Sequence, residues 1–297
     1  MSAPTLGFDI HQTCAVRGTA SFDHAVRGFG AMNNLEGKVA IVTGGTGGIG
    51  KGVALQLAAR GARVVINGRD EKKAQAVLEQ IRTLGGEGCF VAGDVRSKSD
   101  MQTVAAEAAR RFGGIDIVVP NAGGNDDEAR QPQVRGPFAD IDLERVTQFV
   151  AQAVAAKLLV VQAAVPYMCQ RGGGSVVFVT SEGGRSPTPG QTAISVFSGG
   201  LIMASKVLSK ELARDKIRVN CVCVTVVRDT PSWDAAWGQE GGVSEHHRKQ
   251  YEKIVASSPF GVAAPGDIGG VVAFLASDDA AYLTGATVSP TGGLTIH

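Results

Sequence analysis

The feature that most constrains the fold is a regular alternation between short β-branched runs and longer helical patterns. It begins with KVAIVTG at Lys38 and continues through KIRVNCVCVTVV at 216–227. Strands that alternate with helices imply βαβ units, right-handed crossovers and a parallel sheet with helices on both faces. The sequence therefore predicts an α/β fold over 38–297: one doubly wound parallel sheet, a Rossmann fold with three α/β/α layers.

Two segments depart from this alternation. Residues 1–37 show no clear periodicity, so we expect an N-terminal extension there. Residues 226–260 follow the carboxyl end of a predicted strand, where folds of this kind bind ligands, and we expect a substrate lid. Its Trp233 and Trp237 either form aromatic walls of a pocket or only pack the lid.

The bulk composition limits the classes of partner that this chain is expected to bind. A net charge of +1 and a pI of about 7.7 do not favour nucleic acid or an acidic membrane surface. No uninterrupted apolar run approaches the ~18 residues of a membrane helix, and no secretory signal is apparent. Five scattered cysteines, including Cys221 and Cys223 on one predicted strand, argue against a disulfide framework or a metal site. We therefore expect a cytoplasmic protein that acts on a small molecule.

The stretch TGGTGGIG, from Thr43 to Gly50, links the first predicted strand to the first helix. Glycines let a backbone turn approach a pyrophosphate, and the helix N-terminus adds N–H groups and a positive dipole. Its position between strand and helix favours dinucleotide binding over a merely structural turn. The expected phosphate-binding residues are Thr43, Gly44, Thr46, Gly48, Ile49 and Gly50.

The end of the second predicted strand reads INGRD. Enzymes that choose NAD place an acid here for the ribose 2′-hydroxyl, whereas this chain has Asn67, Gly68 and Arg69. A guanidinium suits a 2′-phosphate, so NADP(H) is favoured over NAD(H). Asp94 and Val95, after the third strand, are expected at the adenine.

From Leu35 to Leu294 the sequence resembles the short-chain dehydrogenase/reductase family of the classical type. TGGTGGIG is similar to that family's TGxxxGIG, GDV to its adenine-contacting Asp-Val, and PNAGG to its NNAG with Pro120 in place of the first Asn. IRVN and the C-terminal block also match, although Thr291 stands where the family has Asp. The resemblance implies that Asn121, Ala122, Gly123 and Thr230 contact a nicotinamide cofactor. It also implies a homodimer or homotetramer, formed through helices at 142–168 and 198–215.

The same resemblance implies catalysis by Asn, Ser, Tyr and Lys, and here the sequence departs from the family. Counting from RVN places Ile194 at the Tyr position and Ser198 at the Lys position, while the family's Ser is present as Ser181. Counting from VPYM places Ala153 at the Asn position. Val224 and Thr225 replace the family's Pro-Gly beside the nicotinamide. Lys206 lies too close to RVN to serve as the family's Lys.

Carbonyl reduction needs a proton, which the family's Tyr supplies with a pKa lowered by the Lys cation. General acid–base help is typically worth 10²–10⁴-fold, so the usual reaction is not expected. Three hypotheses follow.

In the first, the protein reduces an iminium-like electrophile that needs no acid, and the missing ammonium removes repulsion. In the second, another acid is recruited for reduction or for non-redox cyclisation or isomerisation: Glu182, Tyr251, His246 or His247, although the last three are more typical of a solvated surface. In the third, the protein is an inactive subunit, alone or with an active paralogue.

Overall fold

The computed structural model describes residues 34–123, 127–237 and 245–297. The chain divides into two units, Met1–Ala31 and Met32–His297, and all described residues belong to the second. The extension expected at 1–37 therefore lies outside the described residues except for its last four. Of these, Leu35 is fully buried, and its backbone N–H donates to the Arg60 carbonyl at 3.1 Å.

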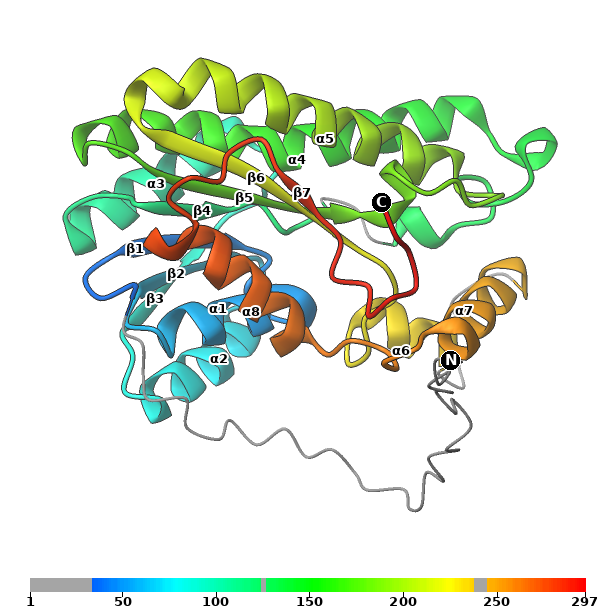
Figure 1. Ribbon diagram of the computed structural model, residues 1–297, viewed down its shortest axis with the longest axis horizontal. Coiled ribbons are helices and arrows are strands. Elements are labelled where there is room, and N and C mark those ends of the chain that lie inside the picture. Colours follow the sequence, from blue (N-terminus) through cyan, green and yellow to red (C-terminus); the bar gives the residue numbers. More distant parts are fainter. Residues whose placement is uncertain (1–33, 124–126, 238–244) are drawn as a thin grey trace, which may run out of the picture. The chain divides into compact units, whose positions relative to one another are not determined.

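A seven-stranded parallel sheet in the order β3-β2-β1-β4-β5-β6-β7 forms the centre of this unit (Figure 1). The predicted fold class is confirmed. The order reverses between β1 and β4, which is the point at which doubly wound sheets open a crevice at their carboxyl ends. The strands are β1 Val39–Thr43, β2 Arg63–Gly68, β3 Gly88–Ala92, β4 Ile117–Val119, β5 Gly174–Ser181, β6 Ile217–Val224 and β7 Thr287–Val288.

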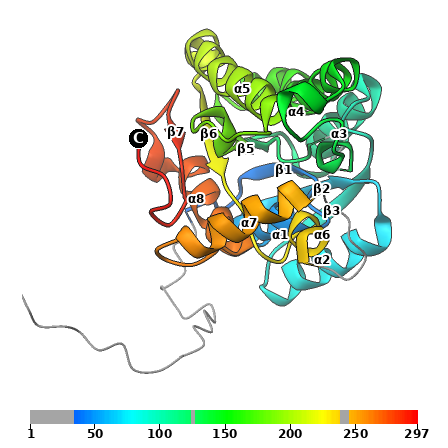
Figure 2. The same ribbon diagram turned by 90° about the vertical axis from the view of Figure 1, so that its right-hand side faces the viewer.

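Helices cover both faces of the sheet, as Figure 2 shows. Alternate residues of each strand point to opposite faces, so Ile41 packs with one helix layer while Ala40 and Val42 pack with the other. The first layer contains α3 Lys98–Phe112, α4 Leu143–Gln170 and α5 Thr192–Glu211. The second contains α1 Gly48–Ala58, α2 Glu71–Thr83 and α8 Pro265–Ala276. The segment expected to be a lid contains α6 Pro231–Trp237 and α7 Glu245–Ser257.

Helix α5 begins at Thr192, six residues before the start that the sequence predicts. Gly199 and Gly200 are poor helix formers and led to the expected boundary at Ser198. Burial decides otherwise, because Ile194, Phe197 and Leu201 lie one turn apart and all enter the core. Residue 194 therefore belongs to the first turn of this helix.

Helices α4 and α5 are both long and apolar enough to cross a membrane, judged by length and composition alone. Counting uninterrupted apolar runs missed this property, because isolated polar residues interrupt both helices. In the structure both helices pack on the sheet, which accounts for part of their apolar character. Part of the remainder is exposed along one side of α5, where Val196, Met203 and Val207 are 55%, 61% and 48% accessible.

Glycines allow α1 and α8 to pack in direct backbone contact. A Cβ added at Gly52 would overlap the backbone of Pro265, and one added at Gly269 would lie 2.5 Å from the Gly52 carbonyl oxygen. Helices that approach this closely tolerate no side chain between them. The crossing thus holds α1, and with it the loop at its N-terminus, against the C-terminal part of the fold.

We expect Gly52→Ala to lower the free energy of unfolding by about 1–3 kcal/mol, because the added methyl overpacks the crossing. Gly270→Ala on α8 is the matched control, since a Cβ there meets nothing within 4 Å. It should leave stability unchanged or raise it by about 0.5–1 kcal/mol. Urea unfolding of both variants measures the difference, and equal stabilities would contradict the assigned crossing.

Candidate active site

A cavity of about 1130 Å³ opens at the carboxyl ends of the strands, on both sides of the switch between β1 and β4. Its lining comes mainly from the loops after β1 to β6, from α4 and α5, and from the lid helices α6 and α7. Each of the predicted cofactor-binding residues except Thr43 and Gly50 lines this one cavity. The topology has therefore brought together residues that lie up to 186 positions apart in the sequence (Gly44 and Thr230).

Thr43 ties the end of β1 to the loop after β4. Its Oγ1 accepts hydrogen bonds from the backbone N–H groups of Asn121, at 3.0 Å, and Ala122, at 3.2 Å. In return, the Asn121 side-chain amide donates to the Thr43 carbonyl at 3.1 Å. These bonds satisfy buried polar groups at the ends of both strands. They also place Gly44 and Asn121 on adjacent walls of the cavity.

The loop from Gly44 to Gly50 has the geometry of a phosphate cradle. Gly44 and Gly48 have φ of +66° and +50°, in the left-handed region that glycine favours. A Cβ on Gly50 would overlap the Gly44 carbonyl, whereas one on Gly47 would meet nothing within 4 Å and would extend into open space. Because α1 starts here with its N–H groups towards the cavity edge, the loop fits a dinucleotide pyrophosphate.

Asn67 and Arg69, at the end of β2, have different roles in the structure that the sequence did not separate. Asn67 is fully buried, and its amide nitrogen donates to the Val91 and Gly93 carbonyls at 3.2 Å each. It therefore holds β2 to β3. Arg69, in contrast, is exposed at the rim of the cavity, beside Gly68 and Thr46.

Asp94 and Val95 line the same end of the cavity. The Asp94 carboxylate accepts hydrogen bonds from the backbone and side chain of Arg96, of which those from Nε and Nη2 measure 2.9 Å and 2.5 Å. This pairing lowers the pKa of Asp94 to about 2. Arg69, Lys73 and Arg96 make this end of the cavity basic.

Thr230 joins the lid to the phosphate loop. Its Oγ1 donates to the Val227 carbonyl at 2.8 Å and accepts from the Trp233 N–H at 3.2 Å, so it caps the start of α6. A Cβ on Gly48 would lie 3.5 Å from its methyl group. Val224 and Thr225, at the end of β6, line the cavity between these parts.

The residues at the expected catalytic positions lie on three elements. Ser181, at the end of β5, lines the cavity, and its Oγ accepts from the Gly183 N–H at 3.1 Å. Ile194, on α5, presents an apolar wall to the same cavity. Ser198 and Ala153 are buried in the core, and neither lines the cavity. No described residue forms a hydrogen bond with the Ser198 hydroxyl.

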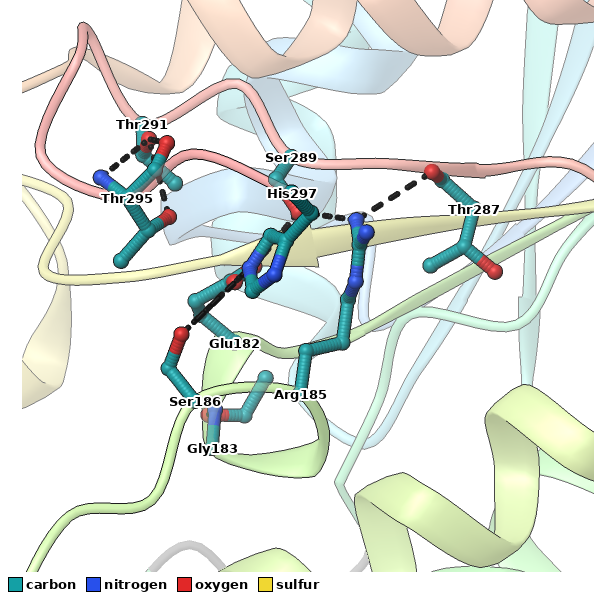
Figure 3. A network of polar contacts seen from close by, with 10 residues as sticks. Glu182, Gly183, Arg185, Ser186, Thr287, Ser289, Thr291, Thr295 and His297 are labelled. Carbon is teal, nitrogen blue, oxygen red and sulfur yellow. Dashed lines mark hydrogen bonds and ion pairs between the residues drawn. The ribbon is translucent and has the colours of Figure 1, made fainter.

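Glu182 is held by the C-terminal segment (Figure 3). The side chain is buried, and one carboxylate oxygen accepts from Ser289 Oγ at 2.6 Å. The other oxygen pairs with His297 Nε2 and accepts from Ser186 Oγ at 3.4 Å. Arg185 extends the network by donating to Ser289 Oγ at 2.7 Å. The Glu182 carboxylate is thus engaged in fixing the C-terminal segment to the loop after β5.

The lid side chains do not have the solvated positions that the sequence led us to expect. Tyr251 and His247 are 8% and 1% exposed, with ring centroids 4.6 Å apart, because α7 packs against α6. Burial raises the pKa of the Tyr251 phenol, an effect that the nearby Arg135 cation partly opposes. The side chain of His246 lies outside the described residues. The rings of Trp233 and Trp237 stack with their centroids 4.1 Å apart and pack within the lid. In the part of the chain that the structure describes, neither residue lines the cavity.

Sequence reasoning missed Lys157, a buried cation in the cavity floor. The side chain is 3% exposed, and its Nζ donates to the carbonyls of Pro120, Asn121 and Val179 at 3.2, 2.5 and 2.8 Å. Lys157 comes one turn after Ala153 on α4. A single Lys within the apolar stretch AVAAKLLVV was the signal that could have revealed it.

Two guanidinium groups at the lid side of the cavity were also missed. Arg130 and Arg135 follow the loop after β4, in a stretch rich in Gln, Pro and Gly that shows no periodicity. Arg130 pairs with Asp127, whereas Arg135 donates from Nη2 to Gln250 Oε1 at 3.3 Å. Only the fold shows that these side chains turn towards the cavity.

Comparisons with known proteins agree with this geometry. The family model described as Enoyl-(Acyl carrier protein) reductase matches residues 44–295. Dehydrogenase/reductase SDR family member 4 of Bos taurus is 35% identical, with 91% of each chain covered.

Among solved structures, a putative short-chain alcohol dehydrogenase from Sinorhizobium meliloti is 28% identical at a TM-score of 0.76, covering 89% of this chain and 98% of its own. A 7α-hydroxysteroid dehydrogenase in complex with NADH and 7-oxoglycochenodeoxycholic acid is 25% identical at a TM-score of 0.77, covering 89% and 96%. The fold, the glycine cradle and these relatives together identify the chain as a member of the short-chain dehydrogenase/reductase family.

Proposed function

We propose that the protein is an NADP(H)-dependent oxidoreductase that reduces an already charged electrophile, such as a protonated imine, without the family's Tyr–Lys pair. The observation that carries this proposal is the contrast between two parts of one cavity. The cofactor end has a complete glycine cradle and the exposed cation Arg69, whereas Ile194 presents an apolar wall where the family's acid is expected.

Replacement acids find little support among the described residues. The Glu182 carboxylate is occupied by Ser289 and His297. The raised pKa of Tyr251 is the opposite of the lowered pKa that makes a Tyr an effective acid near neutral pH. Ser181 remains as a hydrogen-bond donor for a polar group of the substrate, but a hydroxyl is too weak an acid to supply a proton.

A substrate that needs no proton resolves this difficulty. NADPH held by the glycine cradle would supply a hydride to the electrophilic carbon while the C=N π electrons return to nitrogen, so a protonated imine would become a neutral amine and the cofactor would become NADP⁺. The protein then has to hold the two reactants together and exclude water. Ile194 and Phe197 on α5, and Val226 after β6, provide apolar surface for this purpose.

One premise of the first hypothesis needs correction. The loss of Lys at position 198 was expected to leave the site without a buried ammonium, but Lys157 lines the same cavity from α4. A bare cation would therefore meet repulsion in this site. The substrate must therefore carry a compensating negative charge.

We also propose that two copies of the chain associate through α5. The exposed side of this helix presents Val196, Gly200, Met203 and Val207 at a spacing that follows the helical repeat. A continuous apolar stripe of this kind is typical of a helix that packs against a partner. An assembly role without catalysis is the alternative function that this stripe favours.

Arg69→Ala should weaken NADPH binding by about tenfold or more while leaving NADH binding unchanged, because the guanidinium would pair with the 2′-phosphate. Lys72→Ala removes a charge nearby on α2, outside the cavity lining, and should change neither affinity. Nicotinamide fluorescence measures the affinities of wild type and of each variant for NADPH and NADH. Equal losses for both cofactors would contradict the role of Arg69, and no binding of either would overturn the reductase proposal.

The wild-type protein should oxidise NADPH with 1-pyrroline-2-carboxylate at least about 100-fold faster than with its ketone counterpart, 2-oxopentanoate, since only the ketone needs an acid. NADPH absorbance measures both rates. Gly47→Val is the control: its extended backbone accepts a side chain, which would fill the cradle and abolish both reactions. Reduction of the ketone at the rate of the imine would contradict acid-free chemistry.

Met203→Glu should shift the protein from dimer to monomer at micromolar concentration, because it places a charge in the apolar stripe. Leu84→Glu alters an exposed apolar residue at the end of α2 and should leave the assembly unchanged. Light scattering coupled to size-exclusion chromatography gives the mass. An unchanged mass for Met203→Glu would rule out this face as the interface.

A further inference from the structure

The cavity carries more positive charge than the chain as a whole. Seven Lys and Arg side chains line it against three carboxylates among the described residues, although the net charge of the chain is only +1. Two of the three carboxylates, Asp94 and Asp127, are paired with Arg96 and Arg130. Walls of one sign concentrate ligands of the opposite sign. Cofactor binding explains why Arg69, Lys73 and Arg96 line one end of the cavity. It does not explain the cations on the lid side.

Arg135 is a buried lid-side cation whose charge is only partly compensated by its neighbours. Its Nε is buried and, within the described part of the chain, has no hydrogen-bond acceptor. Its Nη2 donates to Gln250 Oε1 at 3.3 Å, longer than the 2.7–2.9 Å of charge-assisted bonds. Its guanidinium carbon lies 5.9 Å from the centre of the Tyr251 ring. Burial lowers the pKa of this guanidinium, which reflects the cost of the site without an anion.

Other arginines of the same chain show what this edge of a guanidinium binds. The Nε and Nη2 groups of Arg145 donate to the two oxygens of Glu128 at 2.8 and 2.9 Å. Arg171 binds Asp116 through the same two groups at 3.1 and 3.2 Å. In Arg135 the Nη2 group of this edge donates to a neutral amide oxygen, with the Tyr251 phenol nearby and no carboxylate among its described partners, so Gln250 occupies half of a carboxylate position.

The location of Arg135 suits the substrate and not the cofactor. Gln250 Oε1 also accepts from Gln191 Nε2 at 3.3 Å, and Gln191 immediately precedes the first residue of α5. Ile194 follows three residues later on the cavity wall. Gln250 on the lid helix α7 thus connects Arg135 to the wall where proton transfer would be expected. Arg130, whose Nη1 is also buried and lacks a described acceptor, lines the same cavity.

We propose that Arg135, assisted by Arg130, binds a carboxylate of the substrate, and that this carboxylate displaces the Gln250 amide as the lid adjusts. The site then takes organic anions and, under the proposed function on which this inference rests, an imine that carries an acid group. The negative charge of the carboxylate offsets the repulsion between a protonated imine and Lys157.

Three probes of one shape and different charge test the site: benzoate, benzamide and benzamidinium. Trp233 and Trp237 are the only tryptophans of the chain, and the Trp237 ring lies 5.4 Å from Tyr251, so Trp fluorescence reports on the lid. With NADP⁺ at saturation, wild type should bind benzoate at least about tenfold more tightly than benzamide, and benzamidinium least. Equal affinities, or the reverse order, would overturn the proposal.

Variants assign the preference to Arg135. Arg135→Gln should remove the preference for benzoate over benzamide, and Arg135→Lys should retain part of it. Arg214→Gln, on an exposed arginine far along the chain, should bind like wild type. A preference that survives Arg135→Gln would contradict the assignment.

The cofactor is measured in the same samples, which separates this inference from the proposed function. NADP⁺ binding with no preference for benzoate would reject the anion site alone. If NADP⁺ did not bind, benzoate would be titrated in its absence. Benzoate binding that is unchanged in Arg69→Ala would show that benzoate does not bind at the cofactor end. A preference for benzoate that persisted in Arg69→Ala and was lost in Arg135→Gln would then reject the reductase proposal alone.

Discussion

The ammonium group of Lys157 holds together the part of the sheet on which the site depends. It donates to carbonyls after β4 and at the end of β5, and so it fixes the distance between the Asn121 loop and the strand that carries Ser181. An ion buried to this extent needs several close oxygen partners, and the ends of two parallel strands supply them. The same charge then acts on whatever enters the cavity. One side chain of α4 thereby connects the architecture of the sheet to the electrostatics of the cavity.

The cavity combines two regions that obey different physical rules. At the cofactor end, recognition is largely a matter of backbone: glycines with positive φ, a helix N-terminus and the Thr43–Asn121 bonds. The other end is lined by side chains from the lid, the loop after β4, α4, α5 and the C-terminal segment. The first region tolerates few changes because a single Cβ would block it. The second can change its chemistry through a few substitutions, which is how one fold serves different reactions.

Much of the fold could be predicted from the sequence, because its signals are local. The βαβ alternation and the glycine cradle each depend on residues close together in the chain. The start of α5 was predicted wrongly because Gly199 and Gly200 suggested a boundary that burial of Ile194 and Phe197 overrides. The prediction that the lid side chains are solvated was wrong for a similar reason. Nothing local indicates that Tyr251 and His247 turn inward against α6.

The sequence by itself determined the fold class, the place of the phosphate loop and the residues that stand at the expected catalytic positions. Short-range patterns are sufficient for these, since strand and helix periodicity and glycine spacing follow from backbone geometry. Only the tertiary structure decided the charge of the cavity. Lys157, Arg135, Glu182 and His297 come from four distant segments, and their effect on a substrate depends on which of them face each other. Electrostatic interactions act through space between side chains, and no pattern along the chain records those distances.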